Sequence, residues 1–254
     1  MPIEWKVTLA VSGPITVEQR TTFNAKKGSE NPFWTKIQVT AAQHGVKIEL
    51  VARADNQEDA NEAALYFVGQ ALDYLCLLIN LPLYVSLSGT QFRPVNDNVK
   101  RILRKNDWEN CFQQSREIGL ERRTFSRSIS WYRKAMVSEN PIDSFLSYWS
   151  SLESLGSKFA QDNPRTQNGI INKICDCFDQ IWNSCDSWKV IPNQVDKVNE
   201  FHELRNGIAH GFISVDIETL KRITQELPII KRLAYEFLKD WDYRDRNPEL
   251  YQNA

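Results

Sequence analysis

The spacing of apolar residues changes once along the chain, about a third of the way from its N-terminus. Apolar and polar residues alternate over 5–11, which predicts a strand buried on one side. Two further alternating runs, 35–42 and 46–54, are joined by a short polar turn and predict a β-hairpin. Asn56 then caps a long predicted helix that runs to about Ile79 with small and apolar residues on its inner side.

Beyond this helix, residues 81–87 predict one more strand. Glycine, proline and asparagine are frequent over 88–98, and the period of the apolar residues changes there from two to 3.6. We therefore expect an α+β protein with a small N-terminal strand-and-helix domain over 1–95, an all-helical bundle over 99–245 and a tail over 246–254. The helices expected in the bundle cover 99–105, 108–118, 121–137, 142–160, 170–182, 193–210, 216–227 and 228–241.

One predicted helix end combines three side chains that suit chemistry at a phosphodiester. Asn206 and His210 are one helical turn apart, and Arg205 lies roughly 100° to one side of Asn206. Arginine offers a planar fork of donors to phosphate, histidine acts as acid or base near neutral pH, and an amide can orient either. The alternative is a helix end whose histidine complements the helix dipole and whose arginine forms a surface ion pair, because Arg-x4-His is short enough to arise by chance.

Glu153 falls on the apolar stripe of its helix, four residues after Trp149. A carboxylate on a packed face needs a partner, because burying an unpaired charge is costly. Arg205 or His210 is the natural candidate, so Glu153 would orient one of them. The equally weighted alternative is that Glu153 lies at the edge of the stripe and reaches water.

Residues 100–137 contain ten Lys or Arg residues against four Asp or Glu residues, within a chain whose net charge is -1. Aromatic residues are interleaved with these charges, and together they would form an RNA-binding face through phosphate contacts and base stacking. The alternative is a solvated helix face whose aromatic residues belong to the core. The RNA-binding candidates are Arg122, Arg123, Arg127, Arg133 and Lys134.

Composition narrows the class of protein. Of the 254 residues, 42% are hydrophobic and 11% aromatic, which excludes a disordered chain. The most apolar run, 63–87, is interrupted by polar residues and proline and predicts a buried helix and a strand rather than a membrane span. Five cysteines without zinc-ligand spacing favour a reducing cytoplasm and core positions, so we expect no metal site and no cofactor.

The segments 130–135, 140–155 and 205–211 resemble the HEPN superfamily, most closely its Apea-like branch, and the resemblance spans about residues 100–245. It implies a helical bundle that cleaves single-stranded RNA without a metal, leaving 2′,3′-cyclic phosphate and 5′-OH ends. His210 would be the general base or acid, Arg205 would stabilise charge on the phosphate, and Asn206 would hold the histidine or the phosphate.

The resemblance also implies a homodimer, because the reaction needs an acid and a base and each chain supplies one motif histidine. His202 would line the cleft without being catalytic. A defence or toxin–antitoxin setting would add an antitoxin or another protein of the same operon as partner.

Two other functions compete with RNA cleavage. The helical domain could be a catalytically inactive HEPN module that binds RNA, a nucleotide or a partner protein through the same cleft. Alternatively, the chain could be an accessory protein of an operon whose α+β half does the recognising, since methylamine-utilisation accessory proteins contain a similar helical domain.

Overall fold

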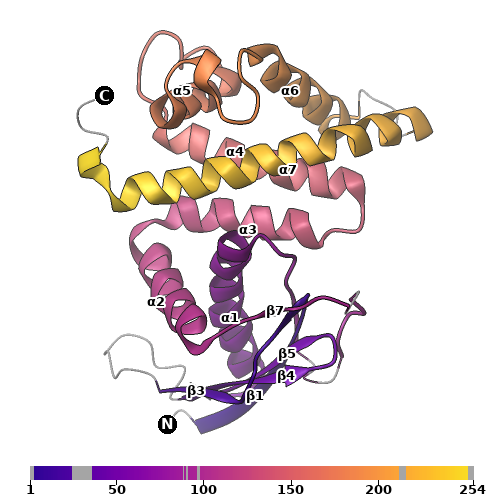
Figure 1. Cartoon of the computed structure of the whole chain (residues 1–254), viewed down its shortest axis with the longest axis vertical. Helices are drawn as coiled ribbons and strands as arrows, with labels where there is room; N and C mark the ends of the chain where they lie inside the picture. The colour runs from indigo at the N-terminus through magenta and orange to yellow at the C-terminus, as the bar shows by residue number, and fades with distance from the viewer. Residues whose placement is uncertain are drawn as a thin grey trace. The chain divides into compact units, whose positions relative to one another are not determined.

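The computed structural model describes residues 3–24, 36–87, 89, 91–95, 98–211 and 216–250. The chain forms two compact units, Met1–Glu121 and Arg122–Ala254. The α+β prediction is confirmed, since strands gather in the first unit and the second is helical (Figure 1). The boundary predicted within 88–98 lies inside the first unit.

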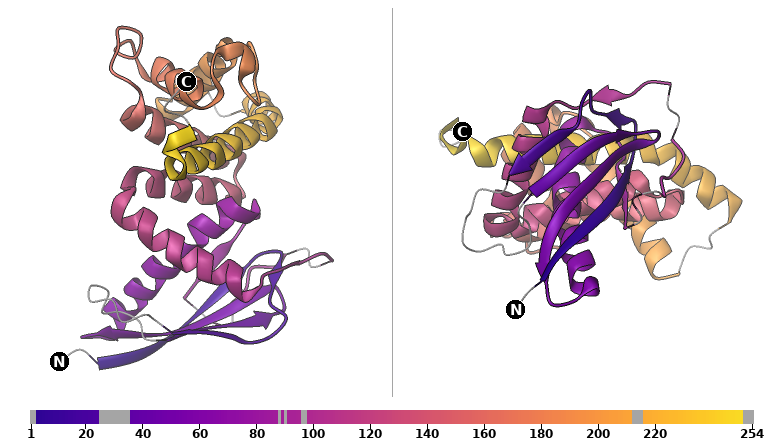
Figure 2. Two further views of the ribbon diagram at one scale, coloured as in Figure 1. Left: turned by 60° about the vertical axis from the view of Figure 1, so that its left-hand side comes forward. Right: turned by 90° about the horizontal axis from the view of Figure 1, so that it is seen from below.

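An antiparallel sheet with strand order β3-β4-β5-β1-β6 forms the centre of the first unit (Figure 2). β1 pairs with β5 from Ile3↔Ala54 to Ser12↔Gly45, and the predicted hairpin is confirmed as β4 and β5 joined by Gln43-His44. The strand bounds are β1 Ile3–Ser12, β2 Ile15–Thr16, β3 Thr21–Asn24, β4 Lys36–Ala42, β5 Gly45–Ala54, β6 Tyr84–Ser86 and β7 Arg101–Ile102.

The predicted cap of the long helix is confirmed. α1 (Gln57–Ile79) begins after Asn56, whose side chain accepts a hydrogen bond from the backbone N–H of Asp59 at 2.9 Å. α1 is the one helix of the described ranges long and apolar enough to cross a membrane, and 61% of its most apolar window is buried. Such burial is typical of the core helix of a soluble protein.

α2 (Lys105–Glu121) packs against α1 within the first unit, although the sequence pattern assigned it to the helical bundle. The rings of Phe67 and Phe112 stack at 5.7 Å, and the Cys111 thiol donates to the Ala71 carbonyl at 2.7 Å.

The helix predicted over 99–105 is wrong. Arg101 and Ile102 form strand β7, which pairs in parallel with β2. The backbone N–H of Arg101 donates to the Pro14 carbonyl, and that of Leu103 donates to the Thr16 carbonyl, both at 2.8 Å. These contacts hold the segment extended.

Helix α4 is the centre of the second unit and contacts each of the other α-helices there. Small residues on its buried face allow close approach: the Ser144 hydroxyl donates to the Ala135 carbonyl of α3 at 2.8 Å, and a Cβ at Gly156 would lie 2.8 Å from Ile174 of α5. The helix bounds are α3 Arg123–Val137, α4 Pro141–Phe159, α5 Ile170–Trp182, α6 Val195–Ala209 and α7 Ile217–Arg246, with short 3-10 turns at Cys185–Ser187 and Pro248–Leu250.

The two helices predicted on either side of Pro228 are one continuous helix, α7, so this prediction is wrong. Proline removes the hydrogen bond to the carbonyl four residues earlier, here that of Thr224. Both residues are exposed, so water can satisfy that carbonyl, and the buried apolar side chains after Pro228 keep the helix packed. Of the predicted tail, residues 251–254 lie outside the described ranges.

Candidate functional site

The candidate residues Arg205 and Asn206 lie in the last two turns of α6. This segment is helical because Val198, Phe201 and Leu204 recur on one side and are buried against the rest of the unit. The remaining sides carry the polar residues and are half-buried or exposed. The packed apolar side therefore fixes the direction in which the polar group projects.

Four side chains from α4 and α6 form one polar cluster. The Nη2 atom of Arg205 lies 3.4 Å from Oε2 of Glu153, and both side chains are 30% exposed. The Nη1 atom of Arg205 donates to Oδ1 of Asn206 at 2.9 Å, and Nδ2 of Asn206 lies 3.1 Å from Nε2 of His202. The structure thus places the partner of Glu153 at Arg205, and the guanidinium is held from two sides while part of it reaches solvent.

The surroundings of His202 in this cluster favour the neutral form of its imidazole. Burial lowers the pKa of His202, and the positive charge of Arg205 lowers it further. A neutral ring has a nitrogen that accepts a hydrogen bond, which matches the donor Nδ2 of Asn206. The cluster therefore places an imidazole of lowered pKa next to a fixed cation.

Trp149 of α4 closes the inner side of the cluster. Its ring centroid lies 5.6 Å from that of His202, and the indole is fully buried. Its Nε1–H is buried without a hydrogen-bond partner in the described part of the chain. The imidazole thus lies against an apolar ring, which explains part of the desolvation that lowers its pKa.

His210 lies at the C-terminal end of α6, one helical turn after Asn206. α6 ends at Ala209, and His210 is the C-cap, where its backbone N–H donates to the Asn206 carbonyl and its side chain is exposed. The helical spacing predicts that Asn206 faces His210, whereas the side chain of Asn206 is turned toward His202. The same i, i+4 spacing relates 202 to 206, so this spacing was the available signal for His202.

The five basic candidates of the region 100–137 separate into different environments. The guanidinium of Arg122 donates to Asp242 and Asp245 of α7 at 2.7 Å each, and its side chain is 17% exposed, so it is committed to packing within the unit. Arg123, Arg127 and Lys134 are exposed on α3, and Arg133 is half-buried.

The exposed cations of α3 lie along one stripe of the helix. Arg123, Arg127, Trp131 and Lys134 follow one another at spacings of four, four and three residues. The Nζ atom of Lys134 lies 4.6 Å from the centroid of the half-buried Trp131 ring. Of the other interleaved aromatic residues, Phe125 and Tyr132 are fully buried, so only Trp131 is available for stacking from this helix.

Within the described ranges, no group of three or more His, Cys, Asp or Glu side chains could hold a metal ion. Burial raises the pKa of Cys175 to about 12 and that of Cys177 to about 12, so both are neutral thiols in the packed interior of the second unit.

Residues 128–239 match the model of a protein family described as methylamine utilization protein MauJ. The chain matches no curated protein and no solved structure. The match covers the segments 130–135, 140–155 and 205–211 that suggested the HEPN superfamily, so that assignment, including its Apea-like branch, is wrong. Arg205, Asn206, His202 and His210 all lie inside the matched region.

Proposed function

We propose that the second unit binds single-stranded RNA at the cluster of Glu153, His202, Arg205 and Asn206 and cleaves it without a metal ion. The observation that supports this proposal is the partly exposed guanidinium of Arg205, which Glu153 and Asn206 hold beside a neutral imidazole. A fixed guanidinium suits the oxygens of a phosphodiester, and the imidazole of His202 would line the site without taking part in proton transfer.

The proposed reaction uses the ribose as its own nucleophile. A base removes the proton of the 2′-OH, the 2′ oxygen attacks phosphorus, and the P–O5′ bond breaks as an acid gives a proton to the departing 5′ oxygen. Arg205 would stabilise the charge on the phosphoryl oxygens. His210, which is exposed at the end of α6, is the predicted acid or base of the Arg-x4-His motif. The products are a 2′,3′-cyclic phosphate and a 5′-OH.

Two features complete this proposal. The stripe of Arg123, Arg127 and Lys134 with Trp131 would bind further phosphates and one base of the RNA. A homodimer would supply a second His210 to a shared cleft, so that acid and base come from different copies. The expected compartment is the cytoplasm.

The test is cleavage of a mixed-sequence single-stranded RNA in EDTA by the wild type, Arg205→Ala, His210→Ala and His202→Gln at matched concentration. Lys231→Gln, an exposed change on α7, is the control. We expect cyclic phosphate ends from the wild type, the control and His202→Gln, and a loss of about 100-fold or more in Arg205→Ala and His210→Ala. Equal cleavage by all five proteins would mean a contaminating nuclease, and no cleavage by any would contradict the proposal.

The second candidate is an accessory role in methylamine utilisation, in which the same cluster binds a partner protein rather than RNA. The family match over 128–239 favours it. In a methylamine-using bacterium that lacks its own member of the matched family, this chain should restore growth on methylamine, and Arg205→Ala should not. Failure of the wild type to restore growth would count against this role.

A further inference from the structure

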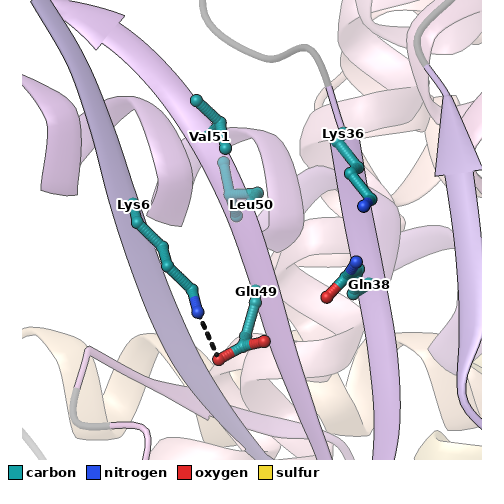
Figure 3. A pocket seen from close by; sticks show the side chains of 6 residues that line it. All are labelled: Lys6, Lys36, Gln38, Glu49, Leu50 and Val51. Carbon is teal, nitrogen blue, oxygen red and sulfur yellow. Dashed lines mark ion pairs between the residues drawn. The ribbon is translucent and has the colours of Figure 1, made fainter.

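The outer face of the sheet in the first unit carries a hollow of about 220 Å³ lined by residues of three strands. Val7, Leu9, Ile48 and Leu50 point to the buried side of the sheet, so the residues that alternate with them point outward. Figure 3 shows the hollow between Lys6 of β1 and the two residues of β4 that face it across β5. The lining residues are Lys6, Lys36, Gln38, Glu49, Leu50 and Val51.

Positive charge exceeds negative charge around this hollow. The Nζ atoms of Lys6 and Lys47 both lie 3.1 Å from Oε1 of Glu49, and the hydrogen bonds from these two lysines lower the pKa of Glu49. One carboxylate therefore balances two ammonium groups. Lys36 adds a third, exposed cation on the opposite side, with no ion-pair partner in the described part of the chain.

The basic face continues beyond the hollow. The guanidinium of Arg20 donates to Oε1 of Gln38, which brings a fourth cation to the rim. The chain as a whole has a net charge of -1, so this is a local concentration of charge rather than a consequence of a basic protein.

The lining of the hollow favours carboxylates over nucleic acid. Among the described residues, no aromatic side chain lines it, whereas single-stranded nucleic acid sites normally provide rings on which bases stack. The half-buried Val51 and the aliphatic stems of the lysines offer an apolar floor for the methylene groups of glutamate side chains. Lysine ammonium groups are point charges that suit single carboxylates at a solvent-exposed site.

We propose that this hollow docks an acidic segment of a partner polypeptide, with Lys6 and Lys36 contacting successive carboxylates from opposite sides. The segment would lie across the outer face of β5 and would also compete with Glu49 for Lys6. This interaction would give the N-terminal unit a recognition role that does not depend on RNA binding by the second unit.

The experiment measures binding of a fluorescein-labelled peptide of twelve glutamates to the full-length chain by fluorescence anisotropy at low salt. The variants are Lys36→Gln, the double variant Lys6→Gln/Lys36→Gln, and Lys231→Gln, a control on the other unit with the same change of charge as Lys36→Gln. A uridine oligonucleotide of twelve residues is the competing probe, labelled in the same way. For each protein with each probe, the dissociation constant is measured at several salt concentrations.

We expect the dissociation constant for the glutamate peptide to rise about threefold in Lys36→Gln and about tenfold or more in the double variant, with no change in Lys231→Gln. Binding should weaken as salt increases. The proposal is overturned if the wild type does not bind the peptide, or if all four proteins bind it equally. Stronger binding of the oligonucleotide, lost in the same double variant, would assign the hollow to nucleic acid and would also overturn it.

Discussion

Replacing Glu153 by glutamine separates the two roles that a carboxylate can have beside Arg205. Glutamine keeps an oxygen that accepts a hydrogen bond from Nη2 of Arg205, so the guanidinium stays in place. The substitution removes the negative charge that a bound phosphate would have to displace. We therefore expect Glu153→Gln to bind RNA more tightly than the wild type, and Glu153→Ala, which loses the oxygen as well, to cleave RNA more slowly.

The distance and the exposure of the pair set the size of the effect. At 3.4 Å the attraction between unit charges is about 1 kcal/mol in water and about 5 kcal/mol at an effective dielectric constant of 20. Both side chains are 30% exposed, so solvent screening reduces the net contribution of this ion pair to about 1 kcal/mol or less. Removing the competing charge should therefore raise the affinity for RNA by up to about fivefold, and should lower the free energy of unfolding by no more than about 1 kcal/mol.

The assay is fluorescence anisotropy with a labelled single-stranded RNA at low salt, together with urea unfolding of each variant. Glu218→Gln, at an exposed position of α7, has the same change in net charge and serves as control. Arg205→Ala should weaken binding about tenfold or more, because charge-assisted hydrogen bonds contribute about 1.5–3 kcal/mol. Unchanged affinity in both Glu153→Gln and Arg205→Ala would refute an anion site at this cluster.

Three further variants test neighbouring parts of the structure. The pKa of His202 is lowered in the folded chain, so its contribution to stability is present above the unfolded pKa of about 6.5 and is lost as the pH falls below that value. The free energy of unfolding, measured with urea, should therefore fall more from pH 7.5 to 5.5 in the wild type than in His202→Gln. Gly156→Ala should lower the free energy of unfolding by about 1–2 kcal/mol because its Cβ would lie 2.8 Å from Ile174, and an unchanged value would show that α5 moves away freely. Arg122→Ala should cost about 1–3 kcal/mol of stability while RNA affinity stays unchanged, whereas weaker binding at unchanged stability would assign Arg122 to the RNA site instead.

Local patterns predicted most of the elements because they act within a few residues. Alternation located β1 and the hairpin, Asn56 marked the start of α1, and the apolar period located α5 at the bounds found in the structure. β7 was missed because two residues are too few to show a period, and its partner β2 lies far away in the sequence. Its conformation depends on that long-range pairing.

The candidate site was predicted in composition but not in arrangement. A half-buried carboxylate needs a partner, so the sequence predicted that Glu153 pairs with Arg205 or His210. The structure pairs it with Arg205. Which histidine meets Asn206 could not be predicted, because 202 and 210 are equally spaced from 206. The choice depends on a side-chain rotamer and on the end of α6 at Ala209, and neither follows from spacing.

Pro228 divides α7 into two parts of unequal local stability. Among the residues before it, only Ile223 is buried, whereas six buried side chains follow it. In the earlier part, Glu226 lies 2.8 Å from Lys197 of α6. Amide hydrogens over 217–227 should therefore exchange with solvent faster than those over 230–241, in an opening that leaves the rest of the unit folded. Since the Glu226–Lys197 ion pair joins this part of α7 to α6, its hydrogen exchange should respond to a ligand that binds at the cluster.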